Sequence, residues 1–119
     1  MASAPLHFAI GTATGMVLLA PRILAAWNAR EKLATATRTW LLISWGCGIV
    51  AAIPSLLRYA GFPESIYANP WMNIFFLHPW INRILPRNEL PGSLAMAICW
   101  TTQYAWVLAA VLRSGRIRK

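Results

Sequence analysis

Three long stretches that are almost free of charged side chains constrain this chain more than any other feature. They cover about residues 6–27, 39–58 and 93–112, and Arg22 is the one charge inside the first of them. A transmembrane helix needs about 20 mostly apolar residues, because each residue rises about 1.5 Å across a hydrocarbon core of about 30 Å. We therefore predict an all-α integral membrane protein with three transmembrane helices over these ranges, forming a single membrane domain over residues 1–119.

The composition agrees with a membrane environment and excludes several kinds of chemistry. Of the 119 residues, 58% are hydrophobic and 12% are charged, whereas a soluble domain devotes about a quarter of its residues to charged side chains. The three acidic residues are all glutamates, so a Ser-His-Asp triad and an aspartate dyad are impossible. Two cysteines are too few for a disulfide scaffold.

The segment over residues 69–85 differs from the three spans. It is rich in apolar residues but too short to cross a bilayer, and Pro79 would break a continuous helix. Asn69 followed by Pro70 is a typical helix start, because the side chain caps and the proline occupies the first helical position. We predict a short interfacial or re-entrant helical segment, anchored at headgroup depth by Trp71 and Trp80.

The basic residues predict the orientation of the chain. With three crossings, eight lie on one side and three on the other: Arg22, Arg30, Lys32, Arg38, Arg113, Arg116, Arg118 and Lys119, against Arg58, Arg83 and Arg87. The positive-inside rule then places the N-terminus outside and the C-terminus in the cytoplasm of a multi-pass protein of the cell (inner) membrane. The same bias explains the net charge of +8, so we expect a lipid bilayer and no nucleic acid as the partner of these charges.

Small and polar residues recur near the centres of the predicted spans. Gly11 and Gly15 form a GxxxG pattern, Gly48 lies at a corresponding depth in the second span, and Gln103 lies in the third. Such residues allow close helix packing and interhelical hydrogen bonds in lipid, either inside the monomer or between copies. We predict that the Gln103 amide bonds to a hydroxyl on a neighbouring helix, from Thr12, Thr14 or Ser44. A quinone or substrate contact is the alternative.

Two histidines and two glutamates share the predicted outer side of the membrane: His7, Glu64, His78 and Glu89. Imidazole and carboxylate are the ligand set of many zinc and iron sites, so these four residues are candidate ligands for a divalent metal. A haem held between His7 and His78 is a second possibility. Neither hypothesis has support from ligand spacing, and the alternative is that both histidines are interfacial residues with a wet tip.

The first half of the chain carries a short family-like pattern. The run Leu6-His7-Phe8-Ala9-Ile10-Gly11 and the later run from Gly48 to Ser55 resemble the predicted inner-membrane metal-dependent hydrolases, which carry an N-terminal His-x-x-x-Gly and a Pro-Asp pair. His7 and Gly11 match the first element, but Ser55 stands where that family has its aspartate. The resemblance therefore implies a degenerate member without metal or activity, and His7 is the one functional position that it transfers.

No catalytic set emerges from these patterns. We therefore predict a small non-catalytic integral membrane protein, without a cofactor, that serves as an accessory or assembly subunit of a larger complex. Its expected partners are other membrane-protein subunits or further copies of itself. Two alternatives remain open: a membrane-embedded, metal-dependent hydrolase-like protein, and a haem- or quinone-contacting subunit of an electron-transfer complex.

Overall fold

The computed structural model describes residues 4–29, 32–67, 69–74 and 89–115, and over these ranges it is helical with no strand. Three helices are long: α1 (Ala4–Ala29), α2 (Leu33–Tyr59) and α5 (Glu89–Gly115). Two short elements follow α2, namely α3 (Glu64–Tyr67) and the 3-10 helix η1 (Pro70–Ile74). The predicted all-α fold with three candidate spans and a shorter helical segment before the last one is confirmed.

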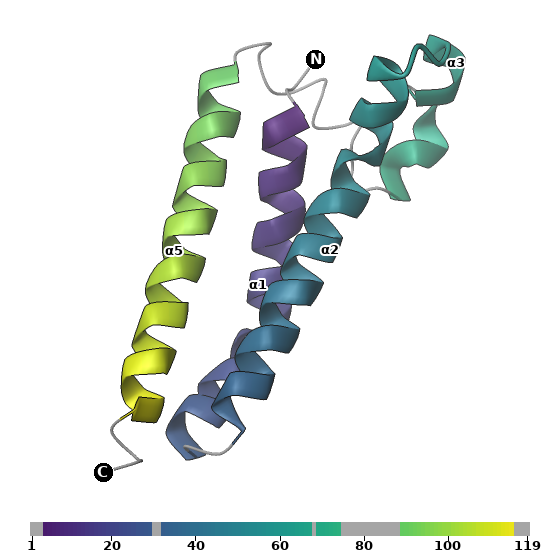
Figure 1. Cartoon of the computed structure of the whole chain (residues 1–119). Coiled ribbons are helices and arrows are strands. Elements are labelled where there is room, and N and C mark those ends of the chain that lie inside the picture. The colour runs from purple at the N-terminus through teal and green to yellow at the C-terminus, as the bar shows by residue number, and fades with distance from the viewer. Residues whose placement is uncertain (1–3, 30–31, 68, 75–88, 116–119) are drawn as a thin grey trace.

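Each long helix has the length and composition of a membrane span. The three contain 26, 27 and 27 residues, or about 40 Å each, which exceeds a hydrocarbon core of about 30 Å. They lie side by side, with α1 and α5 pointing one way and α2 the other (Figure 1). As a result, the start of α1 lies at the opposite end of the bundle from the end of α5, which lies near the α1–α2 turn.

All three helices extend beyond their predicted ranges. The largest difference is at α2, which begins at Leu33 rather than at about residue 39. Leu33 and Thr37 are buried, which means that these first turns already pack within the bundle. α5 begins at Glu89 rather than at residue 93, and Pro91 is tolerated because the first turn of a helix does not need its N–H.

Glycines set the close contact between α1 and α2. A Cβ atom at Gly15 would lie 2.6 Å from Cα of Ser44, and one at Gly11 would lie 2.7 Å from Cβ of Ala51. A Cβ atom at Gly48 would overlap the side chain of Thr12. Three of the predicted packing residues thus lie in one interface inside the monomer, where only a hydrogen can occupy their place.

The third long helix packs on the first and stands apart from the second. α5 contacts α1 along much of its length, including a long contact of 3.7 Å from the Cys99 thiol to the Ala9 carbonyl. Its contacts with α2 are fewer, and Figure 1 shows α5 and α2 on either side of α1. α2 and α5 therefore enclose α1 incompletely and leave a space between themselves.

The connection after α2 is more ordered than a loop in its described part. Figure 1 shows α3 beside the C-terminal end of α2, which it contacts. Asn69 accepts a hydrogen bond on Oδ1 from the backbone N–H of Trp71, 3.2 Å away, as expected for a capping residue at the start of η1. Trp71 is 60% exposed, while its neighbour Met72 is buried. The rest of the predicted segment, including Trp80, lies outside the described residues.

Candidate functional site

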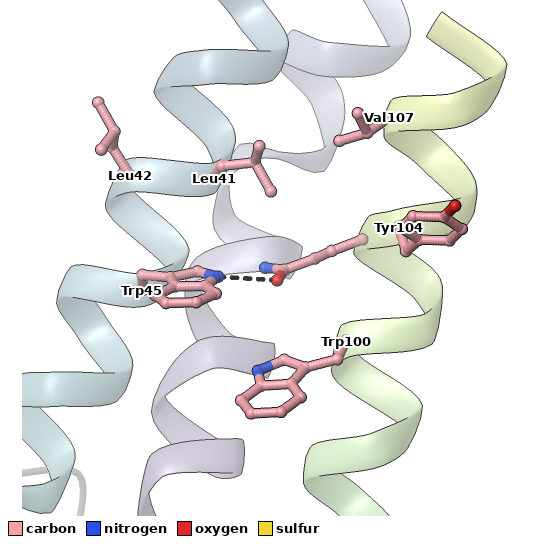
Figure 2. A pocket seen from close by; sticks show the side chains of 7 residues that line it. Leu41, Leu42, Trp45, Trp100, Tyr104 and Val107 are labelled. Atoms are coloured by element: carbon pink, nitrogen blue, oxygen red, sulfur yellow. Dashed lines mark hydrogen bonds between the residues drawn. The ribbon is translucent and has the colours of Figure 1, made fainter.

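The space between α2 and α5 forms an apolar cavity of about 430 Å³ near the middle of the bundle. Figure 2 shows Leu41 and Trp45 of α2 facing Trp100 and Val107 of α5 across it, with Leu42 and Tyr104 at its outer edges. The lining residues are Leu41, Leu42 and Trp45 of α2 and Trp100, Gln103, Tyr104 and Val107 of α5. The cavity is open on one side, so in a membrane it faces the surrounding lipid.

A second cavity of about 470 Å³ continues the first toward the C-terminal end of α5. The two share Leu41, Leu42 and Val107, so they form one groove along the faces of both helices. Its far end is more polar, because Arg38 of α2 and Ser114 of α5 line it. We call this continuous feature, from Trp45 and Trp100 to Arg38 and Ser114, the α2–α5 groove.

A hydrogen bond crosses the floor of the α2–α5 groove. Trp45 donates from Nε1 to Oε1 of Gln103 over 2.9 Å, and Gln103 is only 4% exposed (Figure 2). None of the three expected hydroxyls bonds to Gln103 within the described residues: Ser44 and Thr14 donate to carbonyls of their own helices at 2.6 and 2.8 Å, and Oγ1 of Thr12 has no partner. Gln103 therefore joins α5 to α2 through an indole N–H instead of a hydroxyl.

Two buried polar atoms in this region remain without a hydrogen bond. Because the Trp45 donor fixes Oε1 of Gln103 toward itself, the amide nitrogen Nε2 points elsewhere. Neither Nε2 of Gln103 nor Oγ1 of Thr12 has a partner within the described parts of the chain. The Trp45 hydrogen bond therefore satisfies the carbonyl of the Gln103 amide but not its NH2 group. An unmade hydrogen bond at a buried amide costs about 1–3 kcal/mol.

The rim of the groove carries exposed aromatic side chains. Trp45 and Trp100 lie nearly parallel, with ring centroids 6.4 Å apart and planes 14° apart. Tyr104 is 72% exposed, and its hydroxyl makes no hydrogen bond to any described residue. It lies near the midpoint of the candidate span Leu90–Ser114, at a depth where lipid tails offer no hydrogen-bond partner.

An aromatic cluster joins all three long helices at one end of the bundle. Trp106 of α5 lies between Trp27 of α1 and Trp40 of α2, at centroid distances of 5.0 and 6.0 Å. The Trp106 indole also donates to Oγ1 of Thr37 over 3.2 Å, and the guanidinium carbon of Arg113 lies 4.4 Å from the Trp27 ring. Tryptophan with arginine is typical of the membrane–water interface, so the Trp27–Arg113 end of this cluster marks that boundary.

The structure describes the side chains of only two of the four candidate metal ligands, His7 and Glu64. His7 is 1% exposed inside the α1 helix rather than wet at its tip, and Glu64 is exposed in α3. His78 and the side chain of Glu89 lie outside the described residues. Within the described ranges, no three His, Cys, Asp or Glu side chains are placed to hold a metal ion. The metal and haem hypotheses both need His78, so they stay predictions.

Comparisons with known proteins identify no relative of this chain. No protein-family model, no curated protein and no solved structure matches this chain. The resemblance to inner-membrane metal-dependent hydrolases therefore stays a prediction. His7 and Gly11, which match that family, are buried in the bundle, as is Ser55, which stands in place of its aspartate.

Sequence reasoning missed the aromatic rim of the groove. The signal was present, because Trp45 and Trp100 lie near the centres of their helices whereas membrane tryptophans concentrate at the interfaces. Tyr104, with a hydroxyl at the same depth, belongs to the same anomaly. Three polar aromatic residues at midplane depth on two helices indicate that these residues share one region of the bundle.

Proposed function

We propose that this chain is a non-catalytic subunit of a larger membrane complex, and that its α2–α5 groove holds a transmembrane helix of another membrane protein. The observation that carries this proposal is the exposed Tyr104 hydroxyl on the rim of an otherwise apolar groove at the depth of the membrane centre. A protein helix brings hydrogen-bond acceptors to that depth, and an acyl chain does not.

The dimensions of the groove suit a helix. Along α5 it extends from Trp100 to Ser114, which is about 21 Å or four helical turns. A helix that packs there buries the flat faces of Trp45 and Trp100, and it places a Ser, Thr, Asn or Gln side chain near Tyr104. Small residues at its closest approach would compensate for the bulky aromatic rim.

The charges support a cell-membrane orientation with the N-terminus outside. Among the described basic residues, Arg22, Lys32, Arg38 and Arg113 belong to the end that holds the α1–α2 turn, whereas Arg58 belongs to the other end. Cytoplasmic ends of membrane helices carry such an excess of lysine and arginine. The partner helix would cross the same bilayer beside α2 and α5.

Site-specific photocrosslinking in intact membranes tests the proposal. A benzophenone amino acid at Leu42 lies in the groove, and the same probe at Leu18 on α1 lies outside it with a matched exposure of 68% against 64%. We expect a discrete adduct with another membrane protein from position 42 and none from position 18. In a Tyr104→Phe background the yield from position 42 should fall several-fold, because the polar contact at the midplane is lost.

Each other outcome contradicts the proposal in a recognisable way. Equal adducts from Leu42 and Leu18 would mean nonspecific collision. An adduct of twice the mass of this chain would assign the groove to self-association. An adduct with lipid alone would mean that no helix occupies the groove, and a quinone adduct would favour the electron-transfer alternative.

A further inference from the structure

A cavity on the other side of α2, between α1 and α2, carries two cations on its rim. It has a volume of about 240 Å³ and lies near the turn between the two helices. Arg22 of α1 and Lys32, just before α2, line it together with the hydroxyl-bearing residues Thr35 and Thr39. All four are exposed, so a ligand can approach them from the membrane surface.

The inner wall of this cavity is apolar. Ile23 of α1 and Trp40 of α2, both buried, form part of it beside Ala36. The Trp40 indole is held in place by donating from Nε1 to the backbone carbonyl of Met16 over 3.1 Å. The cavity is thus amphipathic, with cations and hydroxyls outside and a rigid apolar wall inside.

We propose that this α1–α2 cavity binds the phosphate group of an anionic phospholipid, with the first part of an acyl chain against its apolar wall. Arg22 and Lys32 pair with the phosphate oxygens, and Thr35 and Thr39 offer hydroxyl donors. The proposal is independent of the α2–α5 groove, because the α1–α2 cavity and this groove share no lining residue.

The local charge favours an anion. Among the side chains that the structure describes, Glu64 is the one acid, and it lies in α3 at the other end of the bundle (Figure 1). In the sequence Glu31 stands between Arg30 and Lys32, outside the described residues, so the basic residues of this connection still outnumber its one acid. A phosphate from outside the protein supplies the negative charge that the described part of the chain lacks at this end.

The depth of the two cations fits a lipid rather than a soluble ion. Arg22 lies about 8 Å along α1 from the midpoint of the helix, so its backbone is inside a half-core of about 15 Å and its guanidinium must extend toward the headgroups. Lys32 lies beyond it, just before α2 begins. The cavity therefore connects acyl-chain depth with headgroup depth, the two regions that one phospholipid occupies.

Native mass spectrometry of the full chain, released from detergent with equal amounts of phosphatidylglycerol and phosphatidylcholine, tests this assignment. We expect preferential retention of phosphatidylglycerol, and a loss of about fivefold for each charge removed by R22Q and K32Q. R38Q is the matched control, because Arg38 is an exposed cation at the same end that lines the other groove. It should change retention less than twofold.

A second pair of variants tests the apolar wall without changing charge. Ala36→Phe fills the cavity, whereas Ala34→Phe adds the same side chain on the α2–α5 groove. The first should lower phosphatidylglycerol retention several-fold and the second should not. Far-UV circular dichroism and detergent elution volume establish that every variant keeps its helices.

Three results would overturn the proposal. If R38Q weakens retention as much as R22Q, the lipid responds to the general positive charge of this end. If Ala36→Phe has no effect, the cavity does not hold an acyl chain. If excess inorganic phosphate displaces phosphatidylglycerol, the cations form a site for a free anion and not for a lipid.

Discussion

The hydrogen bond between Trp45 and Gln103 allows the energy of the α2–α5 contact to be measured directly. It joins the two helices near the membrane centre over 2.9 Å. Gln103→Leu nearly preserves the shape of the side chain, whereas Trp45→Phe also removes part of a ring that packs on Trp100 and Phe8, a loss that a double-mutant cycle cancels. Trp45→Phe removes the donor, Gln103→Leu removes the acceptor, and the double variant removes both. These four proteins form a double-mutant cycle whose coupling energy belongs to this one contact.

The structure predicts different costs for the two single variants. Interhelical hydrogen bonds in membranes contribute on average about 0.6 kcal/mol and at most about 1.7 kcal/mol. Trp45→Phe leaves the buried Gln103 amide with no partner at either end, so we expect a loss of about 1–2 kcal/mol of unfolding free energy. Gln103→Leu also removes the Nε2 atom that has no described partner, so its cost should be about 0–1 kcal/mol.

Unfolding by sodium dodecyl sulfate in mixed micelles, followed by far-UV circular dichroism, measures the four stabilities. We expect the double variant to lose less stability than the sum of the two single variants, with a coupling energy of about 1 kcal/mol. A coupling energy within about 0.3 kcal/mol of zero would mean that the bond does not form in the membrane protein. A larger loss from Gln103→Leu than from Trp45→Phe would mean that the amide has another partner, which would favour a bound ligand in the groove.

Three further predictions concern packing, topology and the segment after α2. Gly15→Ala should cost about 1–3 kcal/mol in the same unfolding assay, because its Cβ atom would meet the α2 backbone, whereas Gly46→Ala, with nothing within 4 Å, should be neutral or slightly stabilising. In a chain whose native cysteines are replaced by alanine, Ser65→Cys should react with impermeant thiol reagents in intact cells and Ser114→Cys should not, and the reverse pattern would contradict an outside N-terminus. Trp71→Asp should detach the start of the interfacial segment from the lipid. Brominated lipids quench tryptophan fluorescence, and compared with the parent this variant should lose most of the quenching that comes from bromines near the headgroups. Strong quenching from bromines at the bilayer centre would contradict the interfacial position.

The three spans could be predicted from the sequence because length and the near absence of charge decide them. Their ends could not, since a helix need not stop where the hydrocarbon stops. In α2 the residues 33–37 are polar enough to leave the membrane core, yet Leu33 and Thr37 are buried against the bundle and the helix continues. The charged residues of the sequence indicate where the hydrocarbon core ends, whereas packing against the bundle decides where the helix ends.

The contacts of the polar midplane residues were harder to predict for a related reason. Thr14 and Ser44 have hydroxyls that reach the carbonyl four residues earlier, so their own helices satisfy them first. Gln103 has no such local partner, and its longer side chain reaches an indole on α2. The sequence indicates that a buried amide needs an acceptor or a donor, but it does not say which helix face supplies it.

The position of the α2–α5 groove follows from how small and large residues are divided among the helices. α1 approaches α2 closely because Gly11 and Gly15 present no side chain to it. Toward α2, in contrast, α5 presents the large side chain of Trp100, which stacks on Trp45 (Figure 2). Lipid provides no hydrophobic force that would close such a gap. Trp45 and Trp100 therefore line the surface that lies between α2 and α5, and the proposed partner helix would fill this space and bring an acceptor to the Tyr104 hydroxyl at its rim.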